Sequence, residues 1–455
     1  MFPGAPDVAV PQGASEHYLT DIAETARIDE GNVGPFVEGA KTIASWVVTQ
    51  RATALRCTTY GTPECADTYL GWLLPAAYRR APTAAEAQEA RALFNALSTA
   101  YDFDFAVQGL TRAVLLSPQF SYRTELGDAV APGPQVRVLA GHEIALLMAF
   151  GITGKAPDDA LLAASAQLAD ADVREQQARR LMAQSAPAWR RFFWEWMHLS
   201  TLASQAQEVE LDAVLVPQMR EEFDAFVDQV VVQQRGTLSD LLTGKRTWIR
   251  PELARHYGLT HPGSGVQPVE VDTGRGGLLT QGAWLVSKSK RGRDNVVRRG
   301  MAIYLESMCN QVTPPNNLDL TAEVERIAGP NATVAQVVQA RSNDASCGHC
   351  HRVPDPMGLA FEVFSSTAQL RQTYGDGNPV LPSIEIEGLG TVTGGADLGA
   401  ALVQNERFRQ CLVQRVGHFL LGVDPGSPRV NRWPNAADAA FVEHGLSFEE
   451  LLVAY

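Results

Sequence analysis

Residues 82–86, Pro-Thr-Ala-Ala-Glu, carry the sequence pattern of a helix start. Thr83 suits the N-cap position, and Glu86 follows three residues later, so the two side chains can form a capping box with each other's backbone amides. On the N-terminal side of this stretch, apolar residues such as Phe36, Ile43 and Val47 recur at helical spacing. These patterns predict a mainly α-helical protein.

Helical patterns continue along the rest of the chain. Amphipathic or apolar helical spacing recurs in five further stretches, at residues 104–116, 219–232, 296–308, 331–341 and 397–421. Asp158 is placed to cap another helix, and an aromatic cluster at residues 192–196 is interpreted as a core anchor. Residues 384–393 differ, because apolar and polar residues alternate on both sides of Glu387–Gly390, which predicts a small β-hairpin.

Length and composition indicate a folded protein of several domains. A chain of 455 residues corresponds to roughly two to four domains. The content of 45% hydrophobic and 20% charged residues excludes wholesale disorder. Breaks rich in Gly and Pro suggest an N-terminal helical region at residues 1–130, a central helical domain at 135–262 and a C-terminal domain at 269–455, which contains the predicted hairpin.

Charge and hydropathy exclude two classes of partner. The net charge of −13 gives an acidic surface that repels phosphate backbones, so we expect no nucleic-acid partner. No apolar run approaches the roughly 18 residues that a membrane-spanning helix requires. The first residues, MFPGAPDVAV, lack the basic and apolar regions of a signal peptide.

The segment CGHCH at residues 347–351 carries the most specific chemical signal in the chain. Cys347, Cys350 and His351 form the C-x-x-C-H pattern of covalent haem c attachment. The two thiols would add to the vinyl groups of the porphyrin, and the adjacent imidazole would reach the iron as proximal ligand. We therefore expect one covalent haem c at this motif. The alternatives are a CxxC disulfide or a small metal site, for which His349 lies in a strained position.

The other four cysteines are even in number. Cys57 and Cys65 enclose a turn-rich segment, which a disulfide would order. Cys309 and Cys411 then pair by elimination, because the haem uses the remaining two. Haem c is attached outside the cytoplasm, where disulfides also persist, so we expect a periplasmic or extracellular protein.

A basic cluster precedes the haem motif in the sequence. It consists of Lys288, Lys290, Arg291, Arg293, Arg298 and Arg299. In an acidic protein such a cluster could bind haem propionates or an acidic redox partner, or it could be a solvated loop. Residues 355–358, Asp-Pro-Met-Gly, are interpreted as a turn that closes the haem loop, and Glu362 as a residue that bonds the backbone of that loop.

Met357 is the obvious distal ligand, but we predict that it does not ligate the iron. It lies six residues after His351, and six extended residues span at most about 20 Å. That length is close to the path around the porphyrin edge, and two prolines restrict the route. The distal position would then be open, or filled by Met301, Met308 or His418, unless these residues are simply core residues of helices.

Several phrases of the sequence occur together. They are LLSPQFSYRTELG (115–127), PDDALL (157–162), MREEFDAFV (219–227), GLLTQGAWL (277–285), VVRRG (296–300), CGHCHRVPDPMGLAFEVF (347–364) and CLVQRVGHFLLG (411–422). Together they resemble an uncharacterised family of secreted multi-domain proteins of planctomycetes and myxobacteria. The resemblance implies consecutive domains of unknown function, a C-terminal CxxCH and an association with planctomycete-type cytochrome c domains. It also implies a secretion signal and a further helical domain that this chain lacks, so we expect an N-terminal truncation.

The leading functional prediction is an extracytoplasmic c-type cytochrome-like protein that acts in electron transfer or haem-dependent redox chemistry, with an unidentified redox partner. Two alternatives stay open: a secreted binding or scaffold protein in which CxxCH is structural, and a haem peroxidase or oxidase, which requires an open iron position. Zinc-protease chemistry is disfavoured, because His142-Glu143 lacks a second His at residue 146, which is Leu. Nucleotide binding is also disfavoured, because Ala156 follows Gly154-Lys155 where a P-loop needs Ser or Thr.

Overall fold

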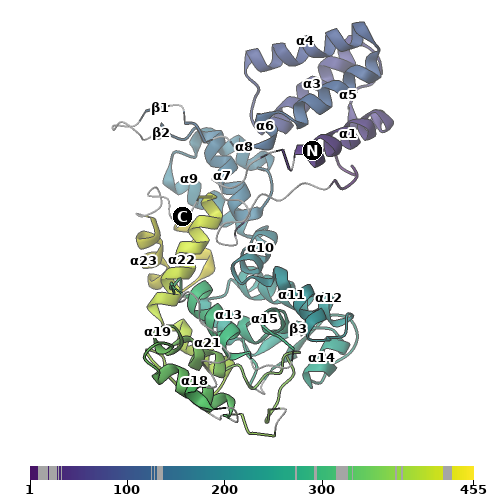
Figure 1. Ribbon diagram of the computed structural model, residues 1–455. Coiled ribbons are helices and arrows are strands. Elements are labelled where there is room, and N and C mark those ends of the chain that lie inside the picture. Colours follow the sequence, from purple (N-terminus) through teal and green to yellow (C-terminus); the bar gives the residue numbers. More distant parts are fainter. Residues whose placement is uncertain are drawn as a thin grey trace. The chain divides into compact units, whose positions relative to one another are not determined.

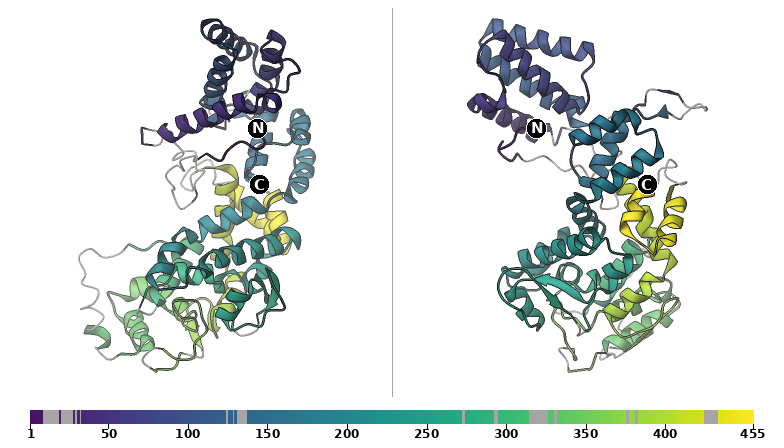
Figure 2. Two further views of the ribbon diagram at one scale, coloured as in Figure 1. Left: turned by 90° about the vertical axis from the view of Figure 1, so that its right-hand side faces the viewer. Right: turned by 180° about the vertical axis from the view of Figure 1, so that it is seen from behind.

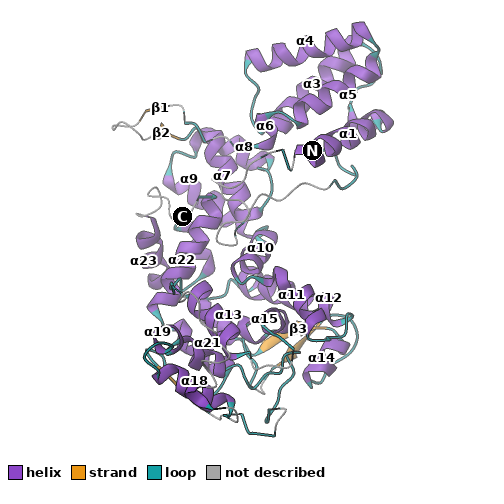
Figure 3. Ribbon diagram, viewed as in Figure 1, coloured by secondary structure: helices purple, strands orange, loops and turns teal. Residues whose placement is uncertain are grey.

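The computed structural model describes residues 1–8, 19, 28, 30–31, 33–123, 125–127, 129–130, 137–271, 274–291, 295–313, 326–329, 332–374, 377–380, 383–423 and 433–455. These residues are mostly helical, which confirms the predicted fold class (Figure 3). Spatial contacts divide the chain into two compact units. Unit 1 comprises Met1–Glu16, Thr20–Leu181 and Leu420–Gly422. Unit 2 comprises His17–Leu19, Met182–Phe419 and Val423–Tyr455.

The described part of unit 1 consists of helices and one very small strand pair. Its elements are α1 (Val33–Thr49), α2 (Arg51–Ala54), α3 (Pro63–Tyr78), α4 (Ala84–Ala100), α5 (Phe103–Leu115), α6 (Pro118–Ser121), β1 (Ala129–Val130), β2 (Arg137–Val138), α7 (Gly141–Thr153), α8 (Asp159–Ala164), η1 (Ser165–Gln167) and α9 (Ala171–Met182). Helix α5 packs on both α1 and α4, as the views in Figures 1 and 2 show. The buried side chains of Tyr69, Leu73 and Leu110 lie in the core of this bundle.

The predicted helix starts of unit 1 are confirmed. The Glu86 amide donates to Thr83 Oγ1 over 3.2 Å, and the Thr83 amide donates to Glu86 Oε2 over 2.8 Å, so the capping box begins α4. Asp158 caps α8 by accepting the Leu161 amide over 2.9 Å. Both helices therefore begin where the side-chain chemistry of the sequence places them.

Unit 2 contains the remaining elements. They are α10 (Ala186–Trp196), η2 (Leu199–Thr201), α11 (Leu202–Glu208), α12 (Leu215–Val227), η3 (Asp228–Gln233), α13 (Leu238–Thr243), β3 (Arg246–Ile249), α14 (Pro251–Tyr257), β4 (Gln267–Glu270), η4 (Leu278–Thr280), α15 (Gly282–Ser287), α16 (Val296–Met301), η5 (Ala302–Ser307), α18 (Val334–Asn343), α19 (Gly348–His351), α20 (Pro354–Leu359), β5 (Ile384–Ile386), β6 (Gly390–Val392), α21 (Gly395–Val403), most of α22 (Glu406–Leu421), α23 (Trp433–Glu443) and α24 (Phe448–Val453). The aromatic residues of α10 form the predicted core anchor, with the Phe192 ring 5.0 Å from that of Phe193 and 5.4 Å from that of Phe419.

Two antiparallel strand pairs lie in the described part of unit 2. Strands β5 and β6 form the predicted hairpin, with Ile384 opposite Val392. Strands β3 and β4 form a second pair, with Arg246 opposite Glu270, which the sequence patterns did not indicate. This pair joins a strand that precedes the Pro- and Gly-rich segment 258–268 to a strand that begins at the end of that segment.

Two of the predicted helices change character along their length. Helix α12 continues as the π-helix η3, and α16 continues as the π-helix η5. The Gln234 amide donates to the Gln229 carbonyl, and the Met308 amide donates to the Ile303 carbonyl, both with the five-residue spacing of a π-turn. Apolar periodicity predicts a helix here but does not distinguish a π-turn from an α-turn.

Both disulfides join the cysteines that the sequence paired. Cys57 bonds Cys65 in the first turn of α3, and Cys309 bonds Cys411 in α22. The second bond closes a loop of 102 residues within unit 2. None of the helices in the described ranges combines the length and apolarity that crossing a bilayer requires.

Candidate functional site

The CxxCH motif forms a single helical turn. Cys347 immediately precedes α19, and its carbonyl accepts the amides of Cys350 and His351, both over 3.1 Å. Residues three and four apart share one face of a helix. The two thiols and the imidazole are therefore placed on one side of this turn.

Asp344 begins the turn. Its Oδ1 accepts the amide of Ser346 over 2.8 Å and that of Cys347 over 3.0 Å. These backbone bonds, together with Arg326, lower the pKa of the Asp344 carboxyl to about 2. An ionised Asp344 therefore fixes the backbone from which the first thiol projects.

His351 is held by a buried carboxylate. Its Nδ1 lies 2.9 Å from Oδ1 of Asp355 in α20, and the other carboxylate oxygen, Oδ2, lies 2.7 Å from a terminal nitrogen of Arg341 in α18. The Asp355 side chain is fully buried, whereas 21% of the His351 side chain is exposed. Because this contact uses Nδ1, the opposite ring nitrogen, Nε2, is the one oriented to bind a metal.

The two cysteines of the motif are thiols in the structure. Cys347 and Cys350 are not joined by a disulfide, and both are partly exposed. Among the described residues, no three His, Cys, Asp or Glu side chains are grouped so that they could hold a metal ion. Haem c needs two thiols and one imidazole from the motif, so this arrangement fits it without further protein ligands.

Asp355 and Met357 lie on α20, which packs tightly on α16. A Cβ atom added to Gly300 would lie 1.9 Å from the Pro354 carbonyl oxygen, and one added to Gly358 would lie 1.9 Å from that of Val296. Both positions therefore require glycine for the two backbones to approach. The segment 355–358 was interpreted as a turn, but the structure places it within a helix that supports His351.

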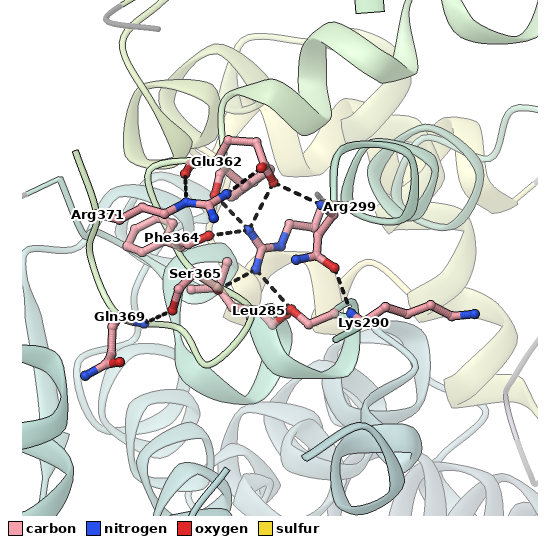
Figure 4. Close-up of polar contacts among 11 residues, drawn as sticks. Leu285, Lys290, Arg299, Glu362, Phe364, Ser365, Gln369 and Arg371 are labelled. Atoms are coloured by element: carbon pink, nitrogen blue, oxygen red, sulfur yellow. Dashed lines mark hydrogen bonds and ion pairs between the residues drawn. The ribbon is translucent and has the colours of Figure 1, made fainter. Parts of the chain in front are cut away.

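The interpretation of the basic cluster as a propionate or partner site, or as a solvated loop, is wrong for Arg299. This guanidinium is fully buried and donates to the carbonyls of Phe361, Phe364 and Ser365 over 2.8–2.9 Å. It also pairs with Glu362 at 3.6 Å, and burial lowers the pKa of Arg299 to about 10. Figure 4 shows this side chain directed at the segment that follows α20. Arg299 therefore stabilises the fold of that segment.

Glu362 contacts two arginine side chains and the backbone of the residue before α16. Its carboxylate is fully buried, pairs with Arg371 as well as Arg299, and accepts the Asn295 amide over 3.2 Å (Figure 4). Glu362 was expected to bond the backbone of the haem loop, but its carboxylate accepts the amide of Asn295, which precedes α16, and its main partners are the two guanidinium groups. A buried carboxylate of this kind requires such partners.

Lys288 is also buried, in a second polar group beside a cavity of about 300 Å³. Its Nζ lies 2.9 Å from Oε2 of Glu306, whose Oε1 lies 3.3 Å from Nδ1 of His198. Burial raises the pKa of Glu306 and lowers that of Lys288. Burial and nearby Lys288 lower the pKa of His198 to about 2, so this imidazole is neutral at pH 7. The charged groups contact each other, so the structure gives no indication that this cavity receives a ligand.

The other basic residues of the cluster have different partners and different exposure. Arg291 pairs with Glu210 at 2.6 Å, and Arg298 donates to Gln205 over 2.8 Å. Lys290 is exposed, and Arg293 lies outside the described residues. The cluster is therefore not one cationic surface.

The candidate distal ligands lie on other elements of unit 2. Met301 ends α16 and lines the cavity beside His198, Met308 is buried after η5, and His418 is buried in α22. Met357 is buried too, with 1% of its surface exposed. The prediction that Met357 does not ligate the iron stays a prediction.

Sequence reasoning missed three residues that hold the motif. Asp355 follows His351 by four residues, which is the spacing of side chains on one face of a helix. Asp344 precedes Cys347 by three residues, which is the spacing between an N-cap residue and the amide it accepts. Both contacts could therefore have been predicted from neighbouring sequence. Arg341 had none, since its contact with Asp355 depends on how α18 packs beside α20.

Three consecutive stretches of the chain match protein-family models. Residues 65–125 match PSD5, a protein of unknown function (DUF1595), residues 139–259 match PSD4, a protein of unknown function (DUF1592), and residues 275–374 match PSCyt3, a protein of unknown function (DUF1588). The chain thus contains three consecutive domains of unknown function, which fit a planctomycete-type multi-domain family. No curated protein and no solved structure matches the chain.

Proposed function

We propose that the chain is an extracytoplasmic c-type cytochrome-like protein with one covalent haem. Cys347 and Cys350 would bind the porphyrin through thioether bonds, and His351 would ligate the iron through Nε2. Haem held in this way supplies one-electron redox chemistry. The observation that carries the proposal is the helical turn of residues 347–351, together with the contact of 2.9 Å between Nδ1 of His351 and Asp355 in α20.

The surroundings of the motif support attachment. Both thiols and His351 are partly exposed, so a porphyrin can approach them from outside the folded core. Asp344 fixes the start of the turn and Asp355 fixes the imidazole, so the chain holds all three reacting groups on ordered backbone. The printed name of the model that covers the motif, PSCyt3, also hints at an association with cytochromes.

An extracytoplasmic location follows from the same chemistry. Two disulfides fit a chain that folds in an oxidising compartment. Attachment of haem c takes place in such a compartment as well. Both features support the proposal that the protein acts in the periplasm or outside the cell.

Intact mass spectrometry tests the attachment. We expect protein produced in the periplasm of a host with cytochrome c maturation to retain the mass of one haem after acid-acetone extraction. Cys347→Ala should weaken attachment, whereas the double variant Cys57→Ala/Cys65→Ala, which loses two cysteines elsewhere, should keep it. Unmodified mass in the wild-type chain would leave the CxxCH motif structural and favour the binding or scaffold function.

A further inference from the structure

His351, Asp355 and Arg341 form a chain of polar contacts in which only the middle residue is fully buried. The imidazole is 21% exposed, the Arg341 side chain is 13% exposed, and the carboxylate between them is fully buried. Each oxygen of Asp355 has a different partner: Oδ1 contacts His351 and Oδ2 contacts Arg341. The carboxylate is thus fixed at both ends.

The backbone around this carboxylate is fixed as well. Pro354, the residue before Asp355, lies against Gly300 of α16, and Gly358 lies against Val296. Arg341 comes from the last turn of α18, which packs on both α19 and α20. Asp355 therefore keeps its place without help from a bound group.

A carboxylate only accepts hydrogen bonds, so a neutral imidazole beside it must donate from Nδ1. The proton then resides on Nδ1, and the lone pair of Nε2 is the one available to a metal. Histidines that ligate metals commonly donate their other N–H to a carboxylate, which orients the ring and increases its basicity. A more basic axial ligand stabilises Fe(III) relative to Fe(II) and lowers the midpoint potential.

We propose that Asp355 is a positioning residue for the iron ligand: it selects the Nδ1–H form of His351 and, together with Arg341, sets the midpoint potential. The part that concerns potential rests on the proposed haem attachment, whereas the part that concerns the tautomer does not. Arg341 withdraws negative charge from the carboxylate, so it opposes the effect of Asp355. The two residues therefore act on the potential in opposite directions.

The first experiment uses the chain without haem, so it does not depend on the proposed function. Nitrogen-15 NMR at pH 8, where an ordinary imidazole is neutral, reports which ring nitrogen carries the proton. We expect the Nδ1–H form at His351 in the wild-type chain and a shift toward the Nε2–H form in Asp355→Asn. A wild-type His351 in the Nε2–H form would overturn the proposal even if haem attaches.

The second experiment measures midpoint potentials of the haem-loaded chain. Asp355→Asn should raise the potential by at least a tenfold change in the reduction equilibrium, about 59 mV for one electron. Arg341→Gln should lower it, and Asp355→Glu should restore part of the wild-type value. Asp344→Asn is the matched control, because it removes an equal charge beside the CxxCH turn without a contact to His351, and its effect should be smaller. Equal potentials in the wild type and Asp355→Asn would contradict the proposal.

Discussion

The Nδ1 atom of His351 lies 2.9 Å from Oδ1 of Asp355, four residues further along the chain. This contact joins two segments with different roles. His351 belongs to the CxxCH turn, which faces solvent, and Asp355 belongs to α20, which is anchored on α16. The motif is thus attached to the core of unit 2 through a side-chain contact as well as through the backbone.

The close approach of α16 and α20 should make two glycines indispensable. Gly300→Ala and Gly358→Ala each place a Cβ atom 1.9 Å from a carbonyl oxygen, so we expect each to lower the free energy of unfolding by about 2–3 kcal/mol. Thermal or denaturant unfolding measures the effect. Gly263→Ala is the control, since no heavy atom lies within 4 Å of its added Cβ and its stability should change little. Wild-type stability in both α16 and α20 variants would show that these backbones are not in contact.

The buried pair of Arg299 and Glu362 should be far more sensitive to mutation than an exposed pair. Glu362→Gln leaves the buried guanidinium of Arg299 without its counter-charge, and Arg299→Met leaves three buried carbonyls without their donor, so we expect each to cost roughly 3–5 kcal/mol of stability. Arg246→Met, which breaks an exposed pair with Glu270, should cost less than about 1 kcal/mol. Equilibrium denaturation of the three variants compares them directly. Similar losses from the buried and the exposed variant would count against the burial of Arg299.

The capping box of α4 should make unit 1 sensitive to acid. Hydrogen bonds from Arg80 and from the helix start lower the pKa of Glu86 to about 2, below the usual 4.5. A carboxyl with a lowered pKa stabilises the folded state fully above its unfolded pKa and loses this contribution as the pH falls toward the folded pKa. Stability should therefore decrease between about pH 5 and pH 2, by about 1 kcal/mol from this group. Glu86→Gln should reduce that decrease, and an unchanged acid limb in the variant would show that Glu86 does not contribute.

Met357→Leu should leave the reduced spectrum and the midpoint potential of the haem-loaded protein nearly unchanged. Met357 is buried on the same short helix as Asp355, only six residues after the proximal histidine. Visible spectroscopy of the oxidised protein checks this, because Met–iron ligation gives a weak far-red absorbance band. Loss of that band in Met357→Leu, but not in Met301→Leu, would show that Met357 is the distal ligand after all.

Local chemistry explains what could be predicted from the sequence. Thr83 and Glu86 together mark the start of α4, and Asp158 marks the start of α8, each through a hydrogen bond between residues three positions apart. The hairpin is also a local feature, because the alternating residues that predict it lie directly on both sides of Glu387–Gly390. The turn-rich segment between Cys57 and Cys65 indicated the first disulfide, and the second followed by elimination, because two of the six cysteines belong to the CxxCH motif.

Long-range packing explains what could not be predicted. Arg299 and Lys288 occur in a basic run, which is typical of a surface, yet each meets a buried carboxylate that another segment supplies. Arg341 contributes to the site only because α18 packs on α20. Strands β3 and β4 pair through residues that lie about 20 positions apart, and no local pattern in the sequence indicated this pairing.

The most direct test of the central claim is a pyridine haemochrome spectrum of the wild-type chain, produced in the periplasm with cytochrome c maturation. We expect the spectrum of a haem bound by two thioether bonds, with one haem per chain, and we expect it to be lost when Cys347 and Cys350 are both replaced by alanine. Wild-type protein that contains no haem, or haem that organic solvent extracts, would contradict the account.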